Sequence, residues 1–159
     1  MSSIRIVQDY PHPVRTVWRA LTDPDLIPRW TATGAGARPV GFAPAVGTRF
    51  QFVAKPKPGW SGIVDCEILA AEEPALLRFS WTDHGGGPTT RVAYLLEPTA
   101  QGTRLVYEHT GFTGVGGRFM AALLGHVRRK MLTVGLPAVL ADLDAGADGL
   151  AAGDRGRNT

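Results

Sequence analysis

GTRLVYEHTGF, residues 102–112, has a bulky or aromatic side chain at every second position from Leu105 to His109. Successive side chains of a β-strand point to opposite faces, so Leu105, Tyr107 and His109 share one face. This alternation predicts a strand with one buried side. The histidine on that side raises a question of function, because an imidazole can titrate near neutral pH.

Four more alternating runs precede this segment, and turn residues separate them. Each run holds apolar or aromatic side chains in phase on one face, which predicts a strand. Because the connections are short, we expect the five strands to form an antiparallel meander. The runs are 48–54, 60–69, 76–82, 89–97 and 103–110.

The rest of the chain predicts one more strand and three helices. Residues 3–10 alternate like a strand, and apolar spacing then predicts short helices near 14–21 and 26–30. Residues 31–47 are rich in Gly, Ala and Pro, and we expect a connection that is mobile in part. Helical spacing over 116–145 predicts a long C-terminal helix.

This order of elements predicts an α+β fold. An antiparallel sheet of about six to seven strands needs one face covered, and only the long helix is large enough to cover it. A strongly twisted sheet bent around one helix leaves a gap, so we expect a cavity between them. Residues 1–145 are predicted to form a single domain, and the polar, Gly-rich 146–159 a disordered tail.

The long helix is expected to be irregular near its middle. Gly135 is a weak helix former and Pro137 cannot donate a backbone hydrogen bond. The apolar stripes before and after these residues lie on opposite faces. We therefore predict a kink or break at residues 133–137.

Charge and cysteine content exclude several classes of protein. The formal net charge is +3, but the basic residues are scattered except for Arg128, Arg129 and Lys130, which we interpret as a solvated helix face. We therefore expect no nucleic-acid partner. The single Cys66 excludes a disulfide framework and a thiolate metal cluster, and it fits a reducing, cytoplasmic location.

Motifs for membranes, metals and cofactors are also missing from the sequence. Residues 1–14 lack the apolar core of a signal peptide, and no stretch approaches the roughly 18 apolar residues of a transmembrane helix. No phosphate-binding glycine motif follows a predicted strand. The histidines have no metal-site spacing, so we expect neither metal nor cofactor. They are His12, His84, His109 and His126.

Five blocks in order along the chain resemble the START-like, helix-grip superfamily, also called SRPBCC. The similar branch is the one named after the activator of Hsp90 ATPase, a relative of the Bet v 1 and polyketide cyclase families. The resemblance spans roughly residues 4–145. The blocks are PHPVRTVWRALTDPDLIPRW (11–30), VGTRFQF (46–52), GWSGIVDCEIL (59–69), EEPALLRFSW (72–81) and GTRLVYEHTGF (102–112).

The resemblance implies a ligand cavity between sheet and C-terminal helix, lined by the side chains that alternation places on the inward face. Core packing alone is the alternative explanation for the same side chains. Those from the strands are Phe50, Phe52, Trp60, Val64, Cys66, Leu77, Phe79, Trp81, Val92, Tyr94, Leu105, Tyr107 and His109. Those expected from the apolar face of the helix are Leu123, Val127 and Met131.

Tyr94, Tyr107 and His109 are the candidates for acid–base chemistry. His109 could be structural, could contact a ligand, or could transfer protons. Inside the protein it is expected to be neutral, because a buried imidazolium is costly. Our hypothesis is that one ring nitrogen orients a ligand oxygen while backbone or Tyr94 holds the other. Cys66 is expected to be a small core residue.

We expect a protein that binds a small, largely apolar molecule without catalysing a reaction. The ligand would be lipid-like, a polyketide or another aromatic natural product. The resemblance also admits an aromatase/cyclase-type enzyme, a self-resistance protein that sequesters a reactive natural product, or an Hsp90 co-chaperone-like interaction protein. The glycine-rich 111–117 would serve the self-resistance function if the backbone is sacrificed. A homodimer is a further expectation.

Overall fold

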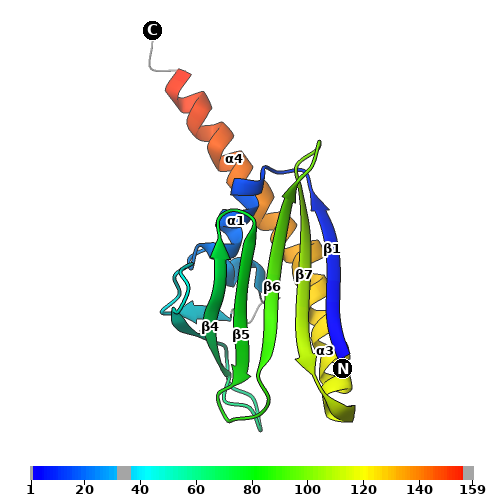
Figure 1. The fold of residues 1–159 in the computed structure, drawn as a ribbon. Coiled ribbons are helices and arrows are strands. Elements are labelled where there is room, and N and C mark those ends of the chain that lie inside the picture. Colours follow the sequence, from blue (N-terminus) through cyan, green and yellow to red (C-terminus); the bar gives the residue numbers. More distant parts are fainter. Residues whose placement is uncertain (1, 32–36, 156–159) are drawn as a thin grey trace.

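The structure, a computed structural model, describes residues 2–31 and 37–155, with side chains described up to residue 146. Strands and helices follow the predicted order (Figure 1). The strands are β1 (Ser2–Tyr10), β2 (Arg38–Val40), β3 (Arg49–Val53), β4 (Ile63–Glu72), β5 (Leu76–Asp83), β6 (Thr90–Pro98) and β7 (Thr103–Phe112). The helices are α1 (Val14–Thr22), α2 (Ile27–Thr31), α3 (Gly114–Lys130), a π-helical turn (Met131–Gly135) and α4 (Leu136–Arg155).

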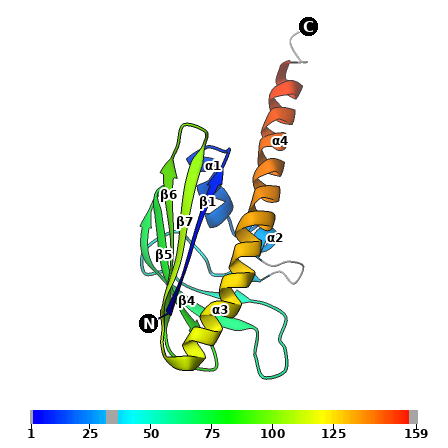
Figure 2. The same ribbon diagram turned by 90° about the vertical axis from the view of Figure 1, so that its right-hand side faces the viewer.

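The strands form one antiparallel sheet of seven strands in the order β1-β7-β6-β5-β4-β3-β2. The long helix made of α3, the π-helical turn and α4 crosses one face of this sheet, and α1 and α2 pack beside it at one end (Figure 2). The predicted α+β fold is confirmed. The sheet buries one face against the helices because its inward side chains are apolar.

The strand β2 corrects one expectation. It lies within 31–47, for which the sequence predicts a connection, and it pairs with β3 from Arg38 opposite Val53 to Val40 opposite Gln51. Three residues with a central proline carry too little alternation to predict a strand, but such a strand is tolerated at a sheet edge. Residues 32–36 of the same segment lie outside the described residues.

The long helix is irregular where the sequence predicts a kink or break, and the irregularity is a π-helical turn. The backbone N–H of Leu136 donates to the carbonyl of Met131, five residues earlier. The next donor in this pattern would be residue 137, a proline without an N–H, so the carbonyl of Leu132 has no partner within the helix. The buried hydroxyl of Tyr10 fills this position and donates to that carbonyl at 2.6 Å.

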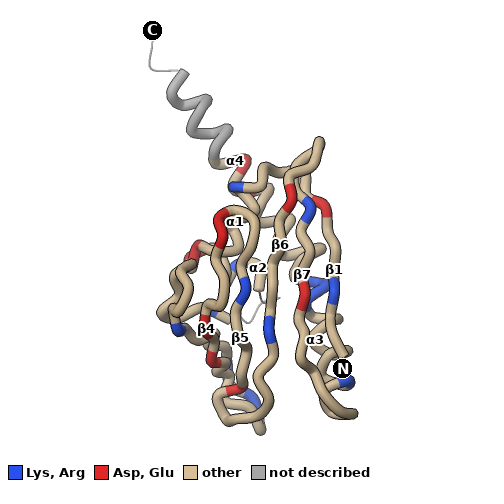
Figure 3. The backbone as a smooth tube through the Cα atoms, in the orientation of Figure 1, with Lys and Arg blue, Asp and Glu red and all other residues tan. Residues whose placement is uncertain are grey.

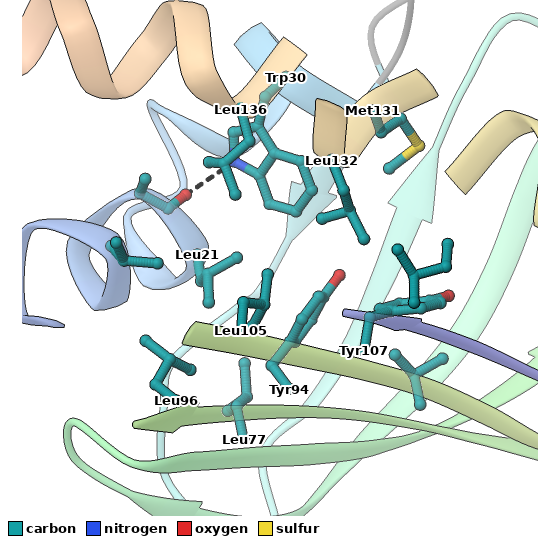
Figure 4. Close-up of a cluster of buried hydrophobic side chains, with 14 of the residues drawn as sticks. Leu21, Trp30, Leu77, Tyr94, Leu96, Leu105, Tyr107, Met131, Leu132 and Leu136 are labelled. Carbon is teal, nitrogen blue, oxygen red and sulfur yellow. Dashed lines mark hydrogen bonds between the residues drawn. The ribbon is translucent and has the colours of Figure 1, made fainter. Parts of the chain in front are cut away.

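A second contact fixes the π-helical turn against α2. A Cβ at Gly135 would lie 2.6 Å from the carbonyl oxygen of Trp30, so only glycine allows this approach. Trp30 is itself held by its indole N–H, which donates to the carbonyl of Ala20 in α1 at 2.8 Å. Figure 4 shows Trp30 packed between these helices and the sheet, beside Leu132 and Leu136.

The helix α3 faces the sheet with a different side than predicted. Leu123 and Val127 are 52% and 38% exposed, whereas the buried residue of α3 is Ala121. The face of α3 that holds Gly125 packs on β1: a Cβ on Gly125 would lie in ordinary van der Waals contact, 3.8 Å from the side chain of Ile4. Ala121 and Gly125 therefore lie on the contact face, together with Leu124, which is partly buried against the core, whereas Leu123 and Val127 point outward.

The prediction that Trp60 lies on the inward face of the sheet is also wrong. Trp60 lies in a turn before β4, is 36% exposed, and donates its indole N–H to Asp83 at 3.0 Å. Gly62 breaks the strand phase, because it has a φ of +80° and its Cβ would lie 2.4 Å from the carbonyl of Ala54. Two-residue periodicity therefore begins only at β4, after Trp60.

The C-terminal helix extends beyond the range predicted for it. The sequence predicts a helix over 116–145, and α4 runs to Arg155, while the domain boundary at residue 145 stays a prediction. Side chains from residue 147 onward and the whole of 156–159 lie outside the described residues. Disorder of the tail stays a prediction.

We predict that truncation on the two sides of the long helix has very different costs. Leu123→Ala removes an exposed side chain and should change the free energy of unfolding by less than about 0.5 kcal/mol. Leu132→Ala empties a fully buried position and should cost about 2–5 kcal/mol. Urea denaturation of both variants measures this, and equal costs would mean that α3 turns its larger apolar face inward.

The contact between Tyr10 and the π-helical turn gives a second prediction. Tyr10→Phe leaves the carbonyl of Leu132 unpaired in the core and should destabilise the protein by about 1–3 kcal/mol. Pro137→Ala restores a backbone N–H at the position that can serve this carbonyl. In that background Tyr10→Phe should therefore cost less, and a double-mutant cycle of denaturation curves measures the coupling. Additive costs would contradict the proposed role of Pro137.

Candidate functional site

A small pocket lies between the inner face of the sheet and the junction of α3 with the π-helical turn. Its volume is about 30 Å³, which is room for one or two water molecules. Strand residues supply most of its wall, and Arg128 and Met131 close it from the helix. The lining residues are Thr31, Ala37, Phe52, Phe79, Trp81, Val92, Tyr94, Tyr107, Arg128 and Met131.

The predicted lining divides into three groups. Seven of the predicted residues line the pocket, as given above: Phe52, Phe79, Trp81, Val92, Tyr94, Tyr107 and Met131. A second group is buried in the surrounding core without lining it: Phe50, Val64, Cys66, Leu77, Leu105 and His109. Trp60, Leu123 and Val127 point elsewhere, for the reasons given above. Thr31, Ala37 and Arg128 are lining residues that the sequence did not predict.

Aromatic rings from four of the strands, β3, β5, β6 and β7, form one wall. Phe52 lies 5.7 Å from Trp81 between ring centroids and 6.0 Å from Phe79. The row continues from Phe79 to Tyr94 at 6.1 Å and from Tyr94 to Tyr107 at 5.4 Å. Such spacings are those of attractive aromatic pairs, so the rings form one continuous, largely apolar wall.

Arg128 turns into this aromatic site from α3. Its Nε donates to the hydroxyl of Tyr107 at 3.1 Å, and one terminal nitrogen lies 3.3 Å from the sulfur of Met131. The guanidinium carbon lies 4.9 Å from the centroid of the Trp81 ring, a cation–π distance. The partly buried guanidinium is the charged side chain among the lining residues.

The sequence predicts that Arg128 belongs to a solvated helix face, because it stands next to Arg129 and Lys130. The structure shows that this prediction is wrong for Arg128. Those two neighbours are exposed, as expected. Arg128, however, lies three residues after Gly125 and seven after Ala121, so it shares their inward face. The spacing from these small residues is the signal that could have identified it.

Tyr94 adds a polar group to the pocket. Burial raises the pKa of its phenol, so the group is a neutral hydroxyl. Within the described part of the chain this hydroxyl makes no hydrogen bond, which leaves it free for a ligand or water. Figure 4 shows Tyr94 and Tyr107 rising from the sheet toward Leu132 and Met131.

His109 lies behind the pocket, not in its wall. The side chain is fully buried, with Nε2 2.6 Å from the hydroxyl of Thr90 and Nδ1 3.5 Å from that of Tyr107. Thr90 in turn donates to the carbonyl of Trp81 at 3.3 Å. The prediction that Tyr94 holds a ring nitrogen of His109 is therefore wrong. Both nitrogens are already engaged by protein groups, the hydroxyls of Thr90 and Tyr107.

One placement of the protons satisfies every group in this series of hydrogen bonds. Arg128 donates to Tyr107, Tyr107 donates to Nδ1 of His109, Nε2–H of His109 donates to Thr90, and Thr90 donates to the carbonyl of Trp81. Burial, together with the positive charge of Arg128, lowers the pKa of His109 to about 3. The imidazole is therefore neutral at neutral pH, as predicted.

Cys66 behaves as the small core residue that the sequence predicts. It is buried, and burial raises the pKa of its thiol, which disfavours the reactive thiolate. In residues 2–31 and 37–155 the structure shows no cluster of side chains suited to hold a metal ion. No helix in the same ranges is both long and apolar enough to span a membrane.

Comparison with solved structures gives the class of the fold. A protein from Mesorhizobium loti, MLL2253, is 30% identical with a TM-score of 0.74, over 89% of this chain and 98% of that one. A protein from Rhodobacter sphaeroides is 24% identical with a TM-score of 0.75, over 89% and 93%. CalU16 from Micromonospora echinospora is 26% identical with a TM-score of 0.62, over 88% and 82%. The fold is that of the SRPBCC, or Bet v 1-like, proteins.

The family follows from the sequence match. The model of the activator of Hsp90 ATPase homolog 1-like proteins matches residues 11–124, and the chain belongs to this family. None of the curated proteins matches the chain.

The buried histidine predicts how stability depends on pH. Between its unfolded pKa of 6.5 and its folded pKa of about 3, the unfolded chain binds the proton and the native protein does not. The stability that neutral His109 supports is therefore complete above pH 6.5 and falls with pH toward 3, by up to about 1.4 kcal/mol per pH unit.

Denaturation curves of wild type and His109→Phe from pH 7 to pH 4 test this. Phenylalanine keeps the ring volume but loses both hydrogen bonds, so the variant should be less stable at pH 7. The difference between the two proteins should shrink as the pH falls, because only the wild type must keep His109 unprotonated. A difference independent of pH would contradict the lowered pKa.

Proposed function

We propose that this protein binds a small, largely apolar and aromatic molecule between the sheet and the long helix, without catalysing a reaction. The observation that carries the proposal is the row of aromatic rings from four strands facing the pocket. Pockets for small organic ligands have mainly apolar and aromatic walls with a few polar groups that fix orientation. Here the hydroxyl of Tyr94 and the guanidinium of Arg128 are such groups.

A volume of about 30 Å³ is too small for such a ligand, so binding requires the pocket to widen. The first two turns of α3 are the part of the long helix that can move at low cost. Residues 114–120 are exposed except for half-buried Gly117, so displacing these turns exposes little apolar surface while Arg128 keeps its contacts. The sheet is held by continuous strand pairing and is the rigid side.

Catalysis of the cyclase type finds little support at this site. His109, the natural general base, does not line the pocket, and its low pKa makes it a poor proton acceptor at neutral pH. Burial also raises the pKa values of Tyr94 and Tyr107. These groups suit hydrogen bonding to a bound molecule better than proton transfer.

Self-resistance by backbone sacrifice and a co-chaperone-like interaction find no supporting observation. Sacrifice of the backbone would need the glycine-rich 111–117 close to the ligand, but none of these residues lines the pocket. The name of the family refers to an Hsp90 activator, and no surface of the described residues points to that partner. Ligand binding therefore stays our proposal, and a homodimer stays a prediction.

Binding of N-phenyl-1-naphthylamine, a neutral probe that fluoresces in apolar surroundings, tests the proposal. Wild-type protein should bind it saturably with one site per chain. Ala37→Trp places an indole at the pocket rim and should weaken binding at least tenfold, whereas Ala43→Trp, at a position outside the pocket, should not. Equal affinity in the two variants would place the probe elsewhere, and absence of saturable binding to wild type would contradict the proposed function.

A further inference from the structure

Arg128 differs from many of the protein's arginines in having no carboxylate partner in the part of the chain that the structure describes. Basic residues of β1 and β7 stand next to acidic ones on the neighbouring strand (Figure 3). The arginines that lie within 4.0 Å of an Asp or Glu oxygen are Arg5, Arg15, Arg19, Arg29, Arg49 and Arg104. These arginines are more exposed than Arg128.

The protein uses only part of the donor capacity of Arg128. Its Nε donates to Tyr107, and one terminal nitrogen faces the weak acceptor sulfur of Met131. A guanidinium has more N–H donors than these two contacts use, and it accepts no hydrogen bonds. The remaining donors have no protein acceptor among the described residues, and Arg128 lines the pocket.

The groups around the guanidinium do not compensate its charge. Its positive charge influences the pKa values of four buried side chains nearby: Tyr107, Tyr94, His109 and Cys66. Each is neutral at neutral pH, because burial raises the pKa of the phenols and the thiol and lowers that of the imidazole. A partly buried cation among neutral groups attracts an anion more strongly than an exposed cation does, because water and salt screen its charge less.

From this arrangement, and resting on the proposed function, we infer that the ligand carries an ionised oxygen, as in an aromatic carboxylate, phenolate, enolate or sulfonate, which pairs with Arg128. The hydroxyl of Tyr94, which has no partner within the described residues, is placed to donate to the same group. The apolar part of the ligand then lies against Phe52 and Trp81. Neutral lipids and plain hydrocarbons fit this site less well.

The buried chain behind the pocket positions the cation. Thr90 holds Nε2 of His109, and Nδ1 of His109 accepts from the hydroxyl of Tyr107. That hydroxyl accepts from Nε of Arg128, and the Trp81 ring supports the guanidinium. A planar cation fixed in this way can present its free N–H groups to a carboxylate or sulfonate in one orientation. Thr90 and His109 are thus positioning residues for ligand recognition, although neither lines the pocket.

Two probes that share a ring system separate this inference from the proposed function. 8-Anilino-1-naphthalenesulfonate carries an ionised sulfonate, and N-phenyl-1-naphthylamine is its uncharged counterpart. Arg128→Met keeps a long apolar side chain and should weaken binding of the sulfonate at least tenfold, while binding of the neutral probe stays within twofold. Arg128→Lys keeps the charge and should retain part of the sulfonate affinity. Arg129→Met removes the exposed neighbouring charge and is the matched control.

The outcomes are distinct. If Arg128→Met leaves sulfonate binding unchanged, or weakens both probes equally, the pairing with an anion is wrong. If Arg129→Met weakens sulfonate binding as much as Arg128→Met, the effect is general surface charge and the inference also fails. If the neutral probe does not bind wild-type protein, the proposed function itself fails. Thermal unfolding of each ligand-free variant supplies a further readout: a structural role of Arg128 lowers the melting temperature of Arg128→Met, whereas a role in ligand binding does not.

Discussion

The position of the long helix over the sheet depends on how one buried carbonyl is satisfied. Pro137 removes the N–H that would serve the carbonyl of Leu132, and the hydroxyl of Tyr10 at the end of β1 takes its place. An unpaired carbonyl in the core would be costly, so this contact ties the π-helical turn to the sheet at one point. Gly135 against the backbone of Trp30 fixes it at a second. Arg128, just before this turn, reaches the pocket because the turn is held in this way.

The hydrogen bonds that connect Arg128 to the buried residues of the sheet depend on this fixed position of the helix. Arg128 points to the sheet, and it meets Tyr107, whose hydroxyl connects to His109 and Thr90. This series of hydrogen bonds ends at a backbone carbonyl, so each member has a partner except the outer side of the guanidinium. The histidine that ends the apolar face of β7 therefore supports a cation instead of meeting a ligand. Its neutrality is a condition for that role, because a second positive charge would repel Arg128.

Much of the sheet could be predicted from the sequence because alternation is a local property, whereas the helix side of the site could not. The inward positions of Tyr107 and His109 follow directly from the two-residue period of β7. Trp60 could not be placed, because Gly62 adopts a positive φ and breaks the phase before β4. On α3 the face toward the sheet holds Ala121 and Gly125, so the hydrophobic stripe centred on Val127 indicates the wrong face. The inward position of Arg128 could not be predicted either, because tertiary contacts decide whether a charged side chain is partly buried.

The central claim is that Arg128, held by Tyr107, meets an anionic ligand in an aromatic pocket. Nuclear magnetic resonance of the arginine Nε–H groups, recorded while 8-anilino-1-naphthalenesulfonate is added, tests this most directly. We predict that the Arg128 resonance shows the largest shift of all arginines at saturation and gives cross-peaks to the naphthalene protons. An unchanged Arg128 resonance at saturating probe, with the shifts confined to exposed arginines, would contradict the account.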